Sequence, residues 1–283
     1  MHQEGLSISS HGQGLTPTTM PSMQFWILSL VISFIGLTKA QASDGLSRDL
    51  PKGDCGKPVA RTDLSHCDFS HRKLSGWDLS GVRLSGVKLD NADLRRAKLA
   101  GADLSGASAK WVNFTAADLR QANFRKADLF HAIFDDAVLE EAQMQETNLF
   151  GANLINSRAA RADFSGAYLK DVLMENIDLT GGSIRRCYAL RGVFSGARLT
   201  GADLSGADLT GAAMEDVDFS GAKLTGAKLL GASLRRTRYA QADLAGADFT
   251  NADVWEADFG HALNRPPSAD EALIEPFVVR ERR

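Results

Sequence analysis

The chain has 283 residues, with 32 Lys and Arg against 35 Asp and Glu and a formal net charge of −3. This near balance argues against a broad electrostatic partner such as nucleic acid or an anionic membrane surface. With 26 glycines and 7 prolines, the composition also excludes a collagen-like chain and a proline-rich linker.

The amino-terminal segment differs from the rest of the chain. Residues 25–37, FWILSLVISFIGL, form an apolar run that is too short to span a bilayer comfortably. Ala40 and Ala42 follow it, a pattern typical of a secretory signal peptide. We therefore expect a signal peptide over 1–42, cleavage before Ser43, and an exported protein, periplasmic or extracellular, with no membrane contact after cleavage.

Two features leave alternatives open for this segment. No Lys or Arg precedes the apolar run, whereas a signal peptide ordinarily begins with a cation. Met20 and Met23 are alternative starts, although neither start supplies the cation. An uncleaved amino-terminal anchor is the alternative to a cleaved signal.

The chain contains three cysteines: Cys55, Cys67 and Cys187. In an exported protein, Cys55 and Cys67 are the candidate disulfide, and closing so short a loop is worth about 2–3 kcal/mol. Cys187 lies far from both and is expected to be a small apolar filler of the core.

The sequence between Leu64 and Phe259 repeats every five residues, through forty pentapeptides without an insertion. A large apolar residue occupies what we call the central position, and only Ala109, Ala159 and Ala189 depart from this. A small residue, mostly Ala, lies two positions earlier. The early repeats have two exceptions at this small position: Arg72 and Trp77.

A period of five fits neither a helix of 3.6 residues per turn nor a strand that alternates every two residues. One large and one small inward residue per pentapeptide would instead fill a narrow shaft. The backbone would then pair with the turns above and below at the strand spacing of ~4.8 Å.

The motif A-(D/N)-L-x-x over residues 62–261 resembles the pentapeptide-repeat family. The resemblance implies an all-β fold, a right-handed quadrilateral β-helix in which four pentapeptides make one coil, and hence about ten coils. The two ends of such a solenoid would expose unpaired edges. We expect residues 43–61 to cap the amino-terminal end and residues 262–283 to cap the carboxy-terminal end.

The carboxy-terminal tail contains signals for a short helix. Pro266 and Pro267 end the repeat, and Ser268 precedes two acidic residues, which indicates a helix start at the serine. The side chains expected to cover the last coil are Leu273, Ile274 and Phe277. In some relatives this end forms a dimer, so a homo-oligomer is one possibility for this chain.

The constant period allows each residue to be assigned to a side of the coil. Sides one to four begin at Leu64, Phe69, Leu74 and Leu79, and each recurs every twenty residues. On side four, the residues just before the central position nearly alternate in charge and predict a solvated face with stacked ion pairs: Asp78, Lys98, Asp118, Val138, Arg158, Asp178, Arg198, Asp218, Arg238 and Asp258.

Sides two and three carry an excess of large apolar residues at outward positions, which is typical of an interaction surface. The candidate residues are Trp111, Phe130, Ile133, Phe150, Ile155, Tyr168, Leu173, Tyr188, Leu190 and Val193. The alternative is that these rings stack between coils for stability. The small central residues Ala109 and Ala189 would also allow Trp111 or Leu190 to turn inward.

We expect no catalytic residue, cofactor or metal. Asp recurs along a convex surface, whereas acid–base catalysis needs a convergent pair in a cleft. A zinc site built from Cys55, His66, Cys67 and His71 is disfavoured, because Cys67 is at an inward position while the two histidines point outward on different sides.

We therefore expect a non-enzymatic interaction or structural module that binds a protein partner or a second copy of itself through the apolar surface. The alternative is suggested by the family's quinolone-resistance members, which resemble duplex DNA and inhibit gyrase. Mixed surface charge and an export signal both argue against a DNA mimic here.

Overall fold

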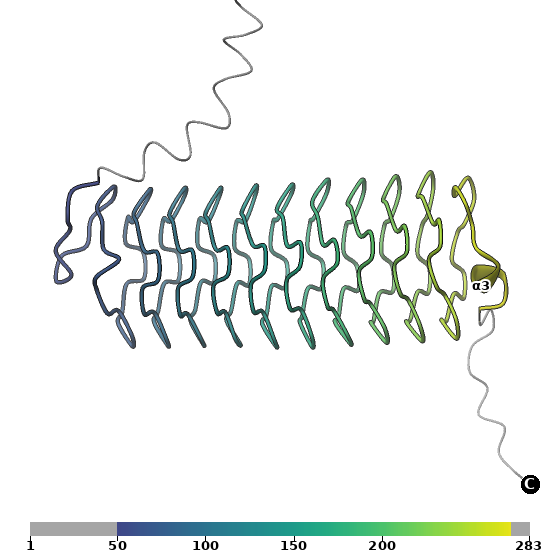
Figure 1. The fold of residues 1–283 in the computed structure, drawn as a ribbon, viewed down its shortest axis with the longest axis horizontal. Helices are drawn as coiled ribbons and strands as arrows, with labels where there is room; N and C mark the ends of the chain where they lie inside the picture. Colours follow the sequence, from purple (N-terminus) through teal and green to yellow (C-terminus); the bar gives the residue numbers. More distant parts are fainter. Residues whose placement is uncertain (1–49, 273–283) are drawn as a thin grey trace, which may run out of the picture. The chain divides into compact units, whose positions relative to one another are not determined.

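The computed structural model describes residues 50–272, and these wind into a stack of similar coils (Figure 1). The residue just before each central position forms a parallel bridge with the residue twenty positions later, as in Asp63↔Arg83 and Asp78↔Lys98. These bridges continue along the chain as far as Leu263. Four bridge residues fall in each twenty-residue turn, so the coil has the four sides that the family resemblance implied.

Neighbouring coils are joined by backbone hydrogen bonds on every side. On side one, the Leu64 N–H donates to the Arg83 carbonyl at 2.9 Å, and the Arg83 N–H donates to the Thr62 carbonyl at 2.9 Å. Only one residue per side has this pairing, so each side is a single bridge and not an extended strand. Among residues 50–272 the one helix is α3, Pro267–Asp270.

The shaft is filled by the central and the small residues. Phenylalanines at central positions stack inside it: the Phe114 and Phe134 rings lie 5.0 Å apart on side three. Phe124 on the opposite side meets them edge-on at 5.7 and 6.0 Å. At the small position, Arg72 and Trp77 are exposed, so these two first-coil residues do not fill the shaft.

Each corner is a tight turn. The N–H of the small residue donates to the preceding central carbonyl, as from Ala92 to Leu89 at 2.9 Å. The third residue of the turn, two after the centre, has a positive φ, from 49° at Arg186 to 74° at Gly76. This conformation defines a type II turn and explains the many Gly, Asn and Asp residues there. Between residues 61 and 261, His66 is the one corner residue whose φ is not positive.

The segment before the repeat pairs with side one of the first coil. Lys52 bridges Asp63, the Gly53 N–H donates to the Asp63 carbonyl at 2.9 Å, and the Asp63 N–H donates to the Pro51 carbonyl at 2.8 Å. Pro58 is buried at the same end. Residues 50–61 therefore contact the first coil through both backbone pairing and apolar burial.

At the other end, the prediction that Ser268 starts the helix is wrong. Pro266 is the N-cap of α3 and provides no side-chain hydrogen bond, and Ser268 lies inside the helix. Its hydroxyl contacts the last coil instead: it accepts from the Phe249 N–H at 3.2 Å and donates to the Ala247 carbonyl at 3.4 Å. The serine thus supplies the partners that another coil would have given side two.

Within the described part of the tail, Ala269 and Ala272 are buried in the core cluster, and Ala262 packs against it. Leu273, Ile274 and Phe277 lie outside the described residues, as does the expected signal peptide over 1–42. Within residues 50–272, no helix has the length and apolarity needed to cross a membrane.

Candidate interaction surface

A ladder of aromatic side chains runs diagonally over side two. It passes from outward positions after the central residue, at Trp111, Phe130 and Phe150, to positions before it, at Tyr168 and Tyr188. Tyr168 and Tyr188 are paired directly by the parallel bridge between their coils. The twenty-residue coil therefore brings together rings that are far apart in the sequence.

The rings of this ladder contact one another face to face. Centroid separations are 5.5 Å for Phe130–Phe150, 6.1 Å for Phe150–Tyr168 and 5.4 Å for Tyr168–Tyr188, with interplanar angles of 5°, 14° and 10°. Trp111 packs edge-on against Phe130 at 5.5 Å. Most ring faces are therefore covered by the next ring, and the ladder presents mainly ring edges to solvent.

His131 belongs to the ladder, although it is not among the residues predicted for the surface. Its ring stacks on Trp111 with centroids 4.3 Å apart and meets Phe130 edge-on at 4.4 Å. Trp111, His131 and Gly151 occupy the same corner position in successive coils, and this twenty-residue spacing was the signal that could have identified it. The absence of a side chain at Gly151 leaves room for the imidazole ring.

The predicted surface is less exposed than the sequence suggested. Trp111, Tyr168 and Tyr188 are 53%, 39% and 38% exposed. The other seven predicted residues are half-buried and not exposed: Phe130, Ile133, Phe150, Ile155, Leu173, Leu190 and Val193. Coils at strand spacing make each outward side chain cover its neighbours, so an outward position is not necessarily a free one.

The three exposed rings are nevertheless distinctive. Within the described chain, the other exposed large apolar side chains are Val59, Trp77 and Leu263, and these lie in the first or last part of the stack. Between the first and the last coil, on what we call the flanks of the stack, exposed large apolar side chains are therefore confined to side two. The small central residues do not draw Trp111 inward, because Trp111 is exposed while Ala109 and Ala189 are fully buried.

Charged side chains border the ladder. The Lys170 ammonium lies 5.7 Å from the Phe150 ring centroid. Arg191 makes two hydrogen bonds of 2.8 Å to the Asp171 carboxylate, and these bonds lower the pKa of Asp171. The border is therefore fixed by paired charges, as in the polar rim of a typical interface.

Side four has the ion pairs predicted from alternating charge, but only in part. Arg198 and Asp178 are 3.5 Å apart and Arg238 and Asp218 are 3.1 Å apart, each pair joining two coils. Two other members find different partners: Asp118 pairs with Arg120, and Arg158 with Glu140. Arg120 and Glu140 each lie just after a central residue of side four. Side chains at that position thus compete with the residue in the next coil for the same ion-pair partner.

The recurring Asp residues serve the backbone. The Asp208 carboxylate accepts the Thr210 N–H at 3.2 Å and its hydroxyl at 2.7 Å. The hollow bounded by Thr200 and His261 is lined otherwise by Gly, Ser, Ala and Gln, so no carboxyl group lines it. Neither arrangement supplies a convergent acid–base pair.

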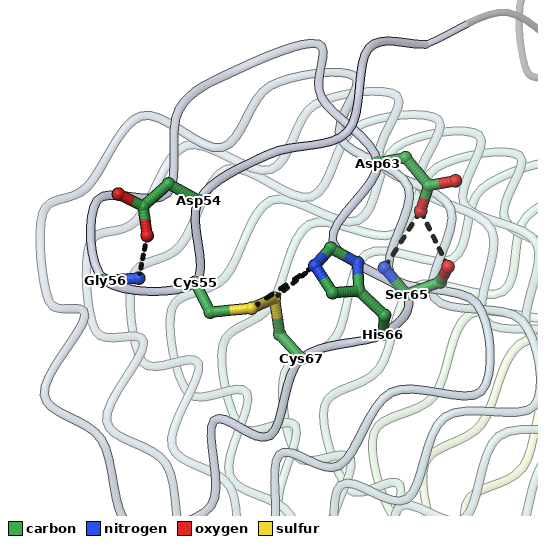
Figure 2. The surroundings of a disulfide bond; sticks show 7 residues. All are labelled: Asp54, Cys55, Gly56, Asp63, Ser65, His66 and Cys67. Atoms are coloured by element: carbon green, nitrogen blue, oxygen red, sulfur yellow. Dashed lines mark hydrogen bonds between the residues drawn. A yellow bond between two sulfur atoms is a disulfide. The ribbon is translucent and has the colours of Figure 1, made fainter.

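Cys55 and Cys67 are joined by a disulfide with their Cα atoms 5.6 Å apart (Figure 2). His66 is exposed and Cys67 is buried, as expected, but the His66 ring lies beside the disulfide. Its Nε2 lies 3.5 Å from the Cys55 Sγ and 3.8 Å from the Cys67 Sγ, whereas His71 is not part of this group. Cys187 is buried elsewhere in the shaft, and burial raises the pKa of its thiol to about 12.

Comparison with solved structures finds several pentapeptide-repeat proteins. HetL from the cyanobacterium Nostoc sp. strain PCC 7120, involved in heterocyst differentiation regulation, is 28% identical over 74% of this chain and 87% of its own, with a TM-score of 0.39. A trypsin-treated form of QnrB1, a plasmid-mediated fluoroquinolone resistance protein, is 22% identical over 66% of this chain and 89% of its own, with a TM-score of 0.40.

A comparison with curated proteins finds no match. The family model for pentapeptide repeats, in contrast, matches in 8 copies, which cover residues 62–181 in overlapping segments and continue over residues 193–263. This is most of the chain, and it coincides with the stacked coils. The chain therefore belongs to the pentapeptide-repeat family.

Proposed function

We propose that this repeat protein is a non-enzymatic interaction module that binds a protein partner through the aromatic ladder of side two. The observation that carries the proposal is the confinement of exposed large apolar side chains on the flanks to Trp111, Tyr168 and Tyr188. Exposed Trp and Tyr are favoured at the centres of interfaces.

The stacking of the ladder supports the same proposal. Tyr188 is held against Tyr168, and Trp111 against His131, so these rings lose little further freedom when a partner covers them. A rigid aromatic surface reduces the entropic cost of binding. Stacking for stability and binding by the exposed edges are therefore compatible roles for one ladder.

Replacing Trp111 by Ser tests this role. We expect the variant to remain folded, because the change removes one stacked and one edge-on ring contact, each worth about 0.5–1.5 kcal/mol. We expect partner binding to weaken by tenfold or more, as for an interface hot spot. The measurement is the affinity for the partner recovered by cross-linking from the exported fraction, together with sedimentation of the isolated protein.

Trp77→Ser is the matched control, because Trp77 is 36% exposed but lies in the first coil, away from the ladder. If both variants bind as the wild type does, the proposal is wrong. Loss of self-association in Trp111→Ser alone would identify the partner as a second copy. Unfolding of the variant at ambient temperature would favour a purely stabilising ladder.

We further propose that the protein is exported. The amino-terminal pattern and the Cys55–Cys67 disulfide both support this, since structural disulfides persist in oxidising compartments. The amino-terminal sequence of the mature protein after cell fractionation tests the proposal, with Ser43 expected as the first residue. A cytoplasmic chain that retains residues 1–42 would overturn it.

Two ion pairs of side four argue against the DNA-mimic alternative, because Arg198 and Arg238 neutralise the acidic residues beside them. Binding to purified gyrase would revive it.

A further inference from the structure

Three side chains that commonly bind metals meet at the amino-terminal end of the described chain. The Cys55 Sγ, Cys67 Sγ and His66 Nε2 atoms all lie within 4.8 Å of one another. Figure 2 shows the imidazole directed at the disulfide from the loop that precedes Cys67. A thiolate, and not a disulfide sulfur, is the metal ligand, so the oxidised and reduced forms of this cluster differ in what they can bind.

We propose that reduction of the Cys55–Cys67 disulfide converts this cluster into a binding site for one zinc ion. Cys55, Cys67 and His66 supply three ligands, and water from the solvent supplies the fourth. The metal ion then links the segment before the repeat to the first coil in place of the disulfide. This proposal is independent of the aromatic ladder and of its partner.

The positions of the nitrogen and sulfur atoms already suit zinc. Tetrahedral zinc with bonds of about 2.3 Å to sulfur and about 2.0 Å to nitrogen sets each N···S edge at about 3.5 Å. The observed distances from the His66 Nε2 are 3.5 Å to the Cys55 Sγ and 3.8 Å to the Cys67 Sγ. Only the two sulfurs need to separate, and a rotation of each cysteine side chain provides this movement.

The backbone around the cluster is held by contacts that do not involve the disulfide. The two segments pair through Pro51, Gly53 and Asp63, as described above. The Asp63 carboxylate also accepts the Ser65 N–H at 3.0 Å and the Ser65 hydroxyl at 2.6 Å. Opening the disulfide therefore leaves Cys55 and His66 near Cys67, and the entropic cost of assembling the ligands is reduced.

A small thiol serves as the reductant of the Cys55–Cys67 disulfide. Two thiol molecules reduce the disulfide, yielding one oxidised disulfide of the reductant and two cysteine thiols in the protein. Zinc then displaces the proton from each thiol, so two protons are released for each metal ion bound. Cys187 does not compete, because it is buried in the shaft and its burial disfavours the thiolate.

Cobalt(II) is a spectroscopic probe for this site. The full-length protein is reduced with a thiol, freed of reductant without oxygen, checked for its β-rich circular dichroism, and titrated with cobalt. We expect one equivalent to bind, with a thiolate-to-cobalt absorption band that zinc abolishes. The oxidised protein should show no such band.

Variants identify the ligands. Cys67→Ser and Cys55→Ser should each abolish the band, and Cys55 is the safer substitution because it lies outside the shaft. His66→Ala should weaken cobalt binding at least tenfold, and His71→Ala, which removes an exposed histidine one corner away, should leave it unchanged. Absence of the band in the folded, reduced wild type, or equal affinity in His66→Ala, would overturn the proposal.

Discussion

The Asp or Asn that precedes many of the central residues meets a need of the corner that follows it. Its side-chain oxygen accepts the backbone N–H two residues later, as Asp218 does from Ser220 at 2.9 Å and Asn123 from Arg125 at 3.1 Å. That N–H has turned away from the neighbouring coils at the corner, and the short polar side chain satisfies it locally. Repetition of Asp thus reflects the repeated turn.

At the same residue scale, we predict that Gly151→Ala destabilises the protein by about 1 kcal/mol more than Gly231→Ala, the value of one aromatic stack. Both glycines occupy side-two corners with nearly equal φ, +61° and +60°, so both substitutions carry the same backbone strain. An added Cβ at position 151 would lie 2.5 Å from the His131 ring, whereas at position 231 it would meet nothing within 4 Å. Denaturant midpoints of the two variants measure the difference.

The double variants with His131→Ala supply the control for this pair. Once the imidazole ring is gone, the two alanine substitutions should cost the same. Equal losses in the presence of His131 would show that the ring moves aside freely and that its stack on Trp111 contributes little.

At the scale of the elements, the period gave each residue its place within a pentapeptide, and the family resemblance supplied the four pentapeptides of a coil. A strict period of five with no insertion leaves no freedom in the assignment, and each bridge residue lies where the period places it, from Asp63 to Leu263. The candidate surface was predictable as a set of outward positions. How much of each ring its neighbours cover depends on side-chain conformations, which no periodicity encodes.

The ends of the repeat were harder to predict because their residues respond to the edge of the stack. Ser268 has the composition of a helix cap, but the open N–H of Phe249 and carbonyl of Ala247 use its hydroxyl instead. His66 occupies a regular corner position, yet its φ is not positive, and its ring lies against the disulfide. In both places a contact that exists only at an end of the stack overrides the conformation expected from the local sequence.

At the scale of the whole molecule, the corner hydrogen bonds connect stability to pH. Hydrogen bonds from the Ser70 hydroxyl and N–H lower the pKa of Asp68, and those from Thr250 lower the pKa of Asp248. A hydrogen bond from Arg236 lowers the pKa of Asp216. Asp135 is the opposite case, because burial raises its pKa. The carboxylates with lowered pKa are distributed along the stack, so small effects add.

We therefore predict that the melting temperature falls as the pH is lowered from about 5 to about 2. A carboxyl group whose pKa is lower in the folded state than in the unfolded chain contributes stability above the unfolded value. That contribution is lost as the pH falls, because the unfolded chain then binds more protons.

Thermal unfolding followed by circular dichroism across this range measures the effect. Repeating it in 1 M salt separates the contribution of the ion pairs from that of the Ser and Thr hydrogen bonds. Salt screens exposed ion pairs such as Arg236–Asp216 but leaves the Ser and Thr hydrogen bonds, so most of the fall should remain. A melting temperature that is constant or rises toward pH 2 would mean that the corner carboxylates contribute no net stability, and that Asp135 and the disulfide determine the behaviour in acid.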